Sequence, residues 1–386
     1  MGADRSLPLR IYRMLVDNSA LLLVGAVIAL AWANLAPASY GVFSHALHFV
    51  ANDIGMVFFF ALAAKEVFEA TLPGGPLGSV RSAALPLLAA SGGMLGPALL
   101  FVGIANSLGI AGLVHGWAIP CATDIAFSAL VARAIFGRGH PAVPFLLLLA
   151  IADDALGLLI LAVFYPTGPL RLVEAVLLVG AGMAVAWWLR QRGVASFWPY
   201  VLGAGSLSWI GLLRGGLHPA LALVPIVGFM PHASADFGPY DHRKDVRHDT
   251  LSEFGHWWKD PVELILLVFG LVNAGVAIAS VGSATWAVAI AMMAGKPVGI
   301  GLTSALGRVL TLELADGVSW RDVLVVGTIS GIGFTVALFF AAAAFPPGPL
   351  LDQTKMGALV SFSAAIAAVG LAAVLRVGRF APARHR

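Results

Sequence analysis

The sequence predicts an all-α polytopic membrane protein with about twelve transmembrane helices. Charged residues make up only 11% of the 386 residues, hydrophobic residues make up 59%, and the mean hydropathy is +0.91. A soluble domain contains about 25% charged residues, so this chain has too few polar side chains to cover a soluble fold. Its apolar residues come in long unbroken runs, whereas the strands of a membrane β-barrel alternate polar and apolar positions. These observations exclude a soluble enzyme and a disordered chain, and they argue against a barrel.

Twelve apolar runs can be placed along the chain, each near the roughly 20 residues that a spanning helix needs. We interpret the first run as a retained span rather than a cleaved signal peptide, because further spans follow directly. Most connections are short and rich in Gly or Pro, which favours one integral-membrane domain over residues 1–386. The exception is the charged segment 232–260, which we expect to be a cytoplasmic loop between spans eight and nine. The expected spans are 20–36, 54–71, 83–105, 113–135, 144–165, 172–189, 197–213, 217–231, 262–281, 284–306, 322–345 and 357–375.

Lys and Arg are distributed unequally between the two sides of this predicted bundle. With a cytoplasmic N-terminus and twelve crossings, 18 of the 23 basic residues fall on the cytoplasmic side. Arg171, Arg214 and Lys355 fall outside, and Lys65 and Lys296 lie within spans. Cytoplasmic loops carry an excess of Lys and Arg, so we expect a multi-pass protein of the cell inner (cytoplasmic) membrane with both termini in the cytoplasm. No basic tract with interleaved aromatics is present, so we expect the lipid bilayer and no nucleic acid as a partner.

Four ionisable residues lie deep within predicted spans: Asp124, the adjacent Asp153 and Asp154, and Lys296. An ionisable group at mid-bilayer costs about 2.5–3.5 kcal/mol on insertion scales, and such residues are usually functional. Three acids against one base leave two carboxylates without a fixed partner, and these must bind either protons or a cation. Competition between protons and a cation for the same carboxylates would exchange one for the other. The alternative is a set of ion pairs that only holds helices together.

Two of the predicted spans are interrupted. Pro120 breaks the fourth span shortly before Asp124, and Gly331 and Gly333 break the eleventh. Broken helices are tolerated only inside protein or beside a water-filled cavity. The two breaks lie in the middle of spans 3–5 and 10–12, which enter the membrane from opposite faces as inverted three-helix repeats. Paired interruptions of this kind mark the binding site of an inverted-repeat transporter, so we expect the two broken helices to cross at mid-membrane.

Other interpretations of these features need different residues. The glycines can instead serve close helix packing, which is the role we expect for the pairs Gly92/Gly96 and Gly295/Gly299. An intramembrane aspartyl protease needs two facing carboxylates that share a proton. The adjacent acids of the fifth span point about 100° apart around a helix and cannot form that pair with each other, whereas Asp124 with Asp154 remains geometrically possible. However, the Gly-x-Gly-Asp motif of presenilin-like proteases is absent, and Lys296 has no place in that mechanism. We therefore expect a transporter and not an enzyme.

Five motifs lie at and around these residues. They are GWAIPCATDIAF at 116–127, AIADD at 150–154, NAGV at 273–276, GKPVG at 295–299 and GIGFT at 331–335. Together they resemble the fourth, fifth, ninth, tenth and eleventh spans of the NhaA-type sodium/proton antiporter family. The similarity runs in order from about Asp17 to past Phe345, and the motifs are long and specific. The resemblance therefore covers nearly the whole chain.

The resemblance implies a role for each buried charge. Asp153 and Asp154 would form the cation and proton site, with Thr123 as a further oxygen ligand of the transported sodium. Asp124 would offset the positive N-termini of the half-helices. Lys296 would offset their negative C-terminal ends and pair with Asp153 when sodium is absent. The chain would then be a secondary active transporter that needs no cofactor and exchanges sodium or lithium for protons by alternating access, in an electrogenic and pH-dependent cycle.

The chain also departs from the pattern of this family. The first external loop, 37–52, is too short for the β-hairpin through which many members dimerise, so a homodimer would lack that interface. The second span keeps Glu66 but not the basic residues that follow it in the family, and Lys65 is an addition. Glu253 and His256 match loosely, and a third match is His218. We take Glu66, Glu253, His256 and His218 as candidates for a pH response.

Two other classes of membrane protein share parts of this design. An inverted-repeat symporter of an organic anion would also contain broken helices, but the surplus of buried acids over bases argues against an anionic substrate. A channel would not need two buried protonatable acids, because alternating access uses them better than a steady pore. We therefore expect a cation/proton antiporter, with the symporter as the alternative.

Overall fold

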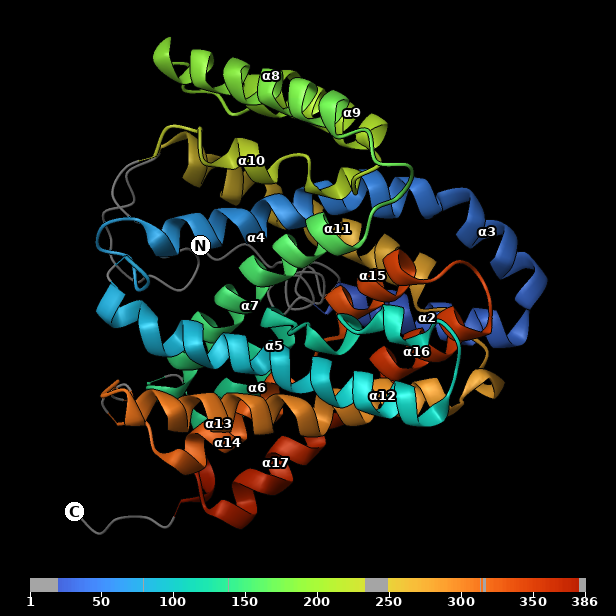
Figure 1. Cartoon of the computed structure of the whole chain (residues 1–386), viewed down its shortest axis with the longest axis vertical. Helices are drawn as coiled ribbons and strands as arrows, with labels where there is room; N and C mark the ends of the chain where they lie inside the picture. Colours follow the sequence, from blue (N-terminus) through green and yellow to red (C-terminus); the bar gives the residue numbers. More distant parts are fainter. Residues whose placement is uncertain are drawn as a thin grey trace, which may run out of the picture.

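The computed structural model describes residues 20–78, 80–137, 139–232, 249–312, 314 and 317–381, with no side-chain description for 80–82. Within these ranges the chain is helical and contains no strand (Figure 1). In the first half, the helices are α2 (Leu21–Leu35), α3 (Pro37–Phe49), α4 (Met56–Thr71), α5 (Val80–Leu108), α6 (Ile125–Phe136), α7 (Ala142–Phe164), α8 (Leu172–Gln191), α9 (Ser206–Gly215) and α10 (Val224–Val227). In the second half, they are α11 (Thr250–Asn273), α12 (Ser283–Ile290), α13 (Lys296–Val309), α14 (Trp320–Ser330), α15 (Phe334–Ala344), α16 (Pro349–Val360) and α17 (Ser363–Leu375).

Several of these helices are continuous with short π-helical turns or preceded by short 3-10 turns. The π-helical turns are η1 (Val50–Gly55), η4 (Tyr200–Gly205) and η8 (Ala291–Gly295), which join α3 to α4, lead into α9, and join α12 to α13. Among the 3-10 turns, η2 (Leu113–Gly116) and η3 (Ile119–Cys121) precede α6, and η5 (Pro219–Leu221) precedes α10. A helix that changes its pitch in this way re-aims the side chains on either side of the turn.

The length of the helices bears on the number of membrane spans. By length and composition, six helices of the described residues could cross a membrane, or up to eight if each bent pair counts as one span. Helix α2 has only 15 residues, and the runs expected as spans seven and eight form the shorter units η4–α9 and η5–α10. Each expected run corresponds to a helical unit, but the number twelve stays a prediction.

Two segments expected as loops are helical. Residues 37–52 form α3 and part of η1, so that one helical run extends over Pro37–Thr71. Helix α11 begins at Thr250, inside the segment 232–260 expected as a charged loop, and residues 233–248 lie outside the described residues. The carboxylate of Asp249 accepts a hydrogen bond from the amide of Ser252 (2.8 Å), which supplies the N-cap. Hydropathy alone overlooked this capping signal.

Helices α5 and α13 cross with their backbones in contact. A Cβ atom at Gly92 would overlap the carbonyl oxygen of Gly299, and one at Gly96 would overlap the carbonyl oxygen of Gly295. Small residues allow membrane helices to approach this closely, which confirms the packing role expected for both pairs. The contact brings the start of α13 next to α7, because α5 also packs against α7.

The two interrupted helices cross inside the bundle. The segment η2–η3 meets α6 at 47°, and α14 meets α15 at 48°. At the crossing, the amide of Asp124 donates to the carbonyl oxygen of Ile332 (2.7 Å), and a Cβ atom at Gly333 would overlap the carbonyl oxygen of Ala122. The expected crossing of two broken helices is therefore confirmed.

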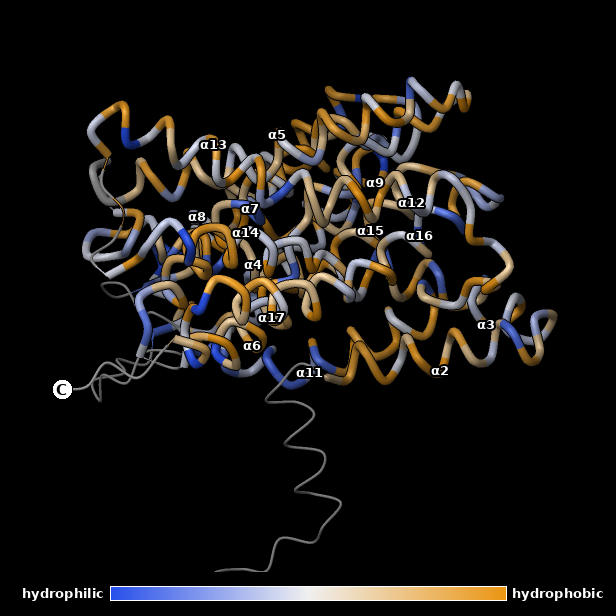
Figure 2. The backbone as a smooth tube through the Cα atoms, turned by 90° about the horizontal axis from the view of Figure 1, so that it is seen from below, coloured by the Kyte–Doolittle hydropathy of each residue, from blue (hydrophilic) through white to orange (hydrophobic). Residues whose placement is uncertain are grey.

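The outer surface of the bundle is apolar along most helices. Figure 2 shows hydrophobic residues along α2 and α17, and side chains such as Val173, Ile366 and Val374 are 74%, 77% and 78% exposed. Exposed apolar side chains on this scale are unfavourable in water and favourable in lipid. The protein is a multi-pass membrane protein.

Candidate cation and proton site

Asp124 joins the two broken helices. It is the N-cap of α6, where its carboxylate accepts a hydrogen bond from the amide of Phe127 (3.3 Å). The same carboxylate accepts hydrogen bonds from the amide of Thr335 (3.3 Å) and from the Thr335 hydroxyl, in the first turn of α15. One buried carboxylate thus lies at two helix N-termini, whose partial positive charges favour an anion. Its role in offsetting these charges stays a prediction.

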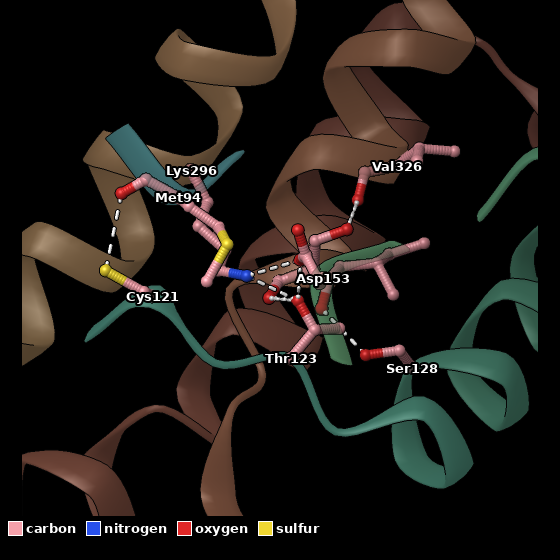
Figure 3. Close-up of polar contacts among 9 residues, drawn as sticks. Met94, Cys121, Thr123, Ser128, Asp153, Lys296 and Val326 are labelled. Carbon is pink, nitrogen blue, oxygen red and sulfur yellow. Dashed lines mark hydrogen bonds and ion pairs between the residues drawn. The ribbon is translucent and has the colours of Figure 1, made fainter. Parts of the chain in front are cut away.

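Lys296 lies at the centre of a second cluster, with Asp153 and Thr123 (Figure 3). The π-helical turn η8 ends just before Lys296, and the lysine is fully buried (0% exposed). Its Nζ donates to Asp153 Oδ2 (2.9 Å) and to the hydroxyl of Thr123. The Thr123 hydroxyl lies 2.7 Å from Asp153 Oδ2 and 3.2 Å from the carbonyl oxygen of Ser330. The three side chains reach one another from α13, α7 and the extended segment before α6.

The two oxygens of Asp153 have different surroundings. Oδ2 accepts from both Lys296 and Thr123, whereas Oδ1 is buried without a hydrogen-bond partner among the described residues. A buried charge is tolerated only where its remaining hydrogen-bonding capacity is satisfied. A proton or a cation bound at the unsatisfied oxygen would therefore stabilise the buried carboxylate.

Asp154 faces a small cavity instead of Lys296. Adjacent residues on α7 point about 100° apart, and in the described part of the chain no hydrogen bond or ion pair reaches the Asp154 carboxylate. The cavity has a volume of about 20 Å³, which is room for one water molecule or an ion of similar size. Its walls include Asp153 and Asp154, together with Phe59, Phe60, Ala63, Met94, Ala122, Gly157, Leu158, Leu161, Val336 and Phe340.

The surroundings of Asp154 are dominated by negative charge. The ionisable groups that act on it electrostatically are Glu66, Asp153, Asp124 and Lys296, so three acids face it with one base. Glu66 lies on α4 one turn beyond Ala63, which forms part of the cavity wall. A cation in the cavity would be attracted by this surplus of carboxylates.

The oxygen atoms of this site suit a hard cation. Carboxylate and hydroxyl oxygens of Asp153, Asp154 and Thr123 are the kind of ligand that hard metal ions prefer. Among the described residues no group of three or more His, Cys, Asp or Glu side chains could hold a metal ion. The cluster offers two carboxylates and one hydroxyl as oxygen donors, and its role in binding a transported ion stays a prediction.

Three of the candidates for a pH response lie towards one end of α4 and α11. Glu66 is half-buried on α4, and Glu253 and His256 are exposed in the first turns of α11. The two helices meet there, because the side chain of Lys65 packs against Gly255. These three residues are therefore grouped near the same helix contact.

The added lysine has a partner of its own. Lys65 forms a buried ion pair with Glu69, one turn later on α4 (2.7 Å). The fourth candidate, His218, lies elsewhere as the N-cap of η5, and its ring is 4.7 Å from the ring of Phe339. His218 therefore does not lie at the contact between α4 and α11 where Glu253 and His256 are found.

Sequence reasoning missed the backbone groups that complete the crossing. The carbonyl oxygens of Ser330 and Ile332 accept from Thr123 and Asp124, and the amide of Thr335 donates to Asp124. Backbone groups carry no residue signature. An interrupted helix, however, leaves carbonyls free at its end, so the residues just before and after Gly331 could have been singled out.

Comparison with known proteins points to one family. The family model described as Na+/H+ antiporter 1 matches residues 10–374. The Na(+)/H(+) antiporter NhaA of Jannaschia sp. (strain CCS1) is 46% identical, over 93% of this chain and 96% of the relative. The protein of that name in Desulfitobacterium hafniense (strain DSM 10664 / DCB-2) is 47% identical, over 94% and 95%.

A third relative and a solved structure agree with this result. The Na(+)/H(+) antiporter NhaA of Geobacter sulfurreducens is 46% identical, over 95% of this chain and 98% of the relative. The sodium proton antiporter MjNhaP1 from Methanocaldococcus jannaschii, solved at pH 8, superposes with a TM-score of 0.53 at 17% identity, over 93% of this chain and 90% of that one, and so shares the fold. On the strength of the family match and these relatives, the chain belongs to the Na+/H+ antiporter 1 family.

Proposed function

We propose that this protein exchanges sodium or lithium for protons across the inner membrane, by alternating access and in an electrogenic cycle. The observation that carries the proposal is the pair of adjacent acids on α7, of which Asp153 is bound to Lys296 while Asp154 faces a cavity without a partner among the described residues. A carboxylate in that position needs a proton or a cation. Each of the two ions therefore displaces the other.

Sodium binding rearranges the cluster around Lys296. The ion takes oxygens from Asp154, Asp153 and the Thr123 hydroxyl, the same atoms that Lys296 occupies on Asp153 and Thr123. Sodium and the ammonium group are both cations, so when sodium replaces Lys296 the Asp153 carboxylate keeps a positive charge beside it. When protons arrive, sodium leaves and Lys296 returns to its partner.

The charge carried by the site makes the cycle electrogenic. In the proton-loaded state Asp154 carries one proton and Lys296, paired with Asp153, carries a second as its ammonium group. When a single sodium ion displaces Lys296 from Asp153, Asp154 and the unpaired buried lysine both release their protons. A cycle that moves more protons than sodium ions transfers net charge, and a membrane potential can drive it. Inward proton movement then drives sodium export.

The crossing of the half-helices suits alternating access. Asp124 lies at the N-termini of α6 and α15 and ties them to one point, while helices on either side can move around it. Both termini are cytoplasmic in this arrangement. Helix α3 occupies the segment where many family members carry a hairpin, so a homodimer would use another face.

The decisive experiment is proton movement in everted membrane vesicles. A dye that reports internal pH should recover its fluorescence when sodium or lithium is added to vesicles acidified by respiration. Asp154→Asn should abolish this recovery while the protein stays folded and inserted, because an amide cannot carry the proton. Glu174→Gln, an exposed carboxylate at the start of α8, should keep it.

Two results would contradict the proposal. Full recovery in Asp154→Asn at normal expression would remove the site from the mechanism. Recovery that depends on an added organic anion instead of sodium would favour the symporter that shares the broken-helix design.

A further inference from the structure

A second cavity, which shares no lining residue with the one beside the acids of α7, lies among η1, the segment before α8 and the end of α9. Its volume is about 380 Å³. Asp53, Arg171 and Arg214 contribute its charged groups, Thr167 contributes a hydroxyl, and Phe49 and Leu213 contribute exposed apolar surface. The cavity thus combines both signs of charge with an apolar rim.

The charges of this cavity do not neutralise one another. No ion pair joins Asp53 to either arginine in the described part of the chain, and no hydrogen bond to the Asp53 carboxylate occurs there. Among the described residues Arg171 pairs only with Glu174, at 3.5 Å between exposed side chains, and such pairs contribute little to stability. Two guanidinium groups and one carboxylate therefore remain for a ligand that carries both charges.

The positions of the two arginines are fixed by the fold. The amide of Thr167 donates to the carbonyl oxygen of Gly216 (2.9 Å), and the amide of Arg171 donates to that of Gly215 (3.0 Å). These bonds tie the segment before α8 to the end of α9, so that Arg171 and Arg214 lie at one rim. A backbone that holds two arginines at one rim leaves only their side chains to be ordered when an anion binds.

The position of the arginines in the bundle indicates where the ligand comes from. In the orientation that the charge count favours, only three Lys or Arg residues lie outside, and two of them contribute to this cavity. Just beyond it, Val173, Val176 and Leu177 of α8 are 74%, 69% and 67% exposed, a surface suited to acyl chains. The cavity therefore lies where the headgroup region of a bilayer meets an apolar helix face.

We propose that this cavity binds the headgroup of a zwitterionic phospholipid that carries an ammonium group. The phosphodiester lies between Arg171 and Arg214, since guanidinium groups bind phosphate oxygens with directed N–H donors. The ammonium lies at Asp53, and the acyl chains follow the exposed face of α8. The site is independent of the proposed cation site and would hold α8 and α9 against α3.

Lipid-dependent thermal unfolding of the full chain in detergent tests this proposal. Short-chain phosphatidylethanolamine should raise the unfolding temperature more than phosphatidylglycerol, which has the phosphodiester but no ammonium. Arg171→Gln and Arg214→Gln should each weaken the apparent binding about tenfold. Asp53→Asn should remove the preference for phosphatidylethanolamine. Arg192→Gln, an exposed arginine at the opposite end of α8, serves as the matched control and should bind like the wild type.

Two further measurements separate the lipid from other sources. Glycerophosphoethanolamine, which has the headgroup and no acyl chains, should stabilise the protein far less than the lipid. Mass spectrometry of the wild type released from mixed micelles should show retained phosphatidylethanolamine, and this needs no substitution. Equal stabilisation by both lipids, or unchanged binding in both arginine variants, would overturn the proposal. Equal stabilisation by glycerophosphoethanolamine would assign the cavity to a soluble phosphoester instead.

Discussion

Replacing Lys296 by methionine should destabilise the protein strongly. Its Nζ is fully buried and donates to two oxygens, on Asp153 and Thr123. A hydrogen bond to a charged group contributes about 1.5–3 kcal/mol, and the loss of one partner of a buried ion pair costs about 3–5 kcal/mol. We therefore expect Lys296→Met to lower the free energy of unfolding by about 3–5 kcal/mol, mainly because Asp153 stays buried without its cation.

A double-mutant cycle separates this stranded charge from other effects of the substitution. Asp153→Asn in the Lys296→Met background removes the carboxylate that caused the loss. The double variant should then be more stable than the sum of the single losses, with an interaction energy of about 1–3 kcal/mol. The loss in Lys296→Met alone should also shrink at acid pH, because the stranded carboxylate can then bind a proton.

The assay is unfolding of the purified protein in detergent, followed by tryptophan fluorescence at several pH values. Glu174→Gln provides the comparison, because it breaks an ion pair between exposed side chains that is worth at most about 1 kcal/mol. Equal losses for Lys296→Met and Glu174→Gln, or strictly additive effects in the cycle, would refute the buried pair as a source of stability.

Three further predictions concern packing, capping and pH. Gly299→Ala should lower the free energy of unfolding by about 1–3 kcal/mol, because its Cβ atom would overlap the Gly92 carbonyl. Gly301→Ala, on the same helix, should not, because its Cβ atom would only make an ordinary contact with Leu324 (3.9 Å), and fluorescence-detected melting checks both. Asp124→Asn should lower the unfolding temperature, because the N-termini of α6 and α15 lose the charge that they share, and unchanged melting would contradict this. Lowering the pH by one unit should raise the apparent Km for sodium up to about tenfold, while the maximal rate falls much less. Sodium titrations at several fixed pH values check this, and a maximal rate that collapses at acid pH while Km stays constant would indicate a dedicated gate.

The sequence predicted the chemistry of the candidate site better than the outline of the helices. Buried ionisable residues are expensive in lipid, so Asp124, Asp153, Asp154 and Lys296 stand out against long apolar runs whatever their exact positions. Helix breaks at Pro120 and at the glycines of the eleventh span are equally visible, because backbone constraints belong to the residue type. These signals are local, and they predicted the crossing of the broken helices.

Other features depend on contacts between distant segments. Nothing in the sequence shows that Thr123 lies beside the carbonyl oxygen of Ser330, because a carbonyl has no residue signature. Hydropathy assigned 37–52 to a loop, although the chain there forms one helical run that continues into α4. Arg171 and Arg214 line one cavity although they are 43 positions apart in the sequence. The count of basic residues predicted only that both lie on the outer side of the membrane.

The arrangement of charges explains why the site would respond to protons and sodium together. Asp124 is held by two helix N-termini and Lys296 by Asp153, so both are neutralised by parts of the protein itself. Asp154 has no such partner among the described residues, and the negative charges of the acids around it disfavour an ionised Asp154 carboxylate. Its charge can therefore be balanced only by something that enters the cavity. With room for one small occupant, a proton on the carboxylate and a sodium ion beside it would exclude each other, and in the proposed cycle this exclusion would couple the two flows.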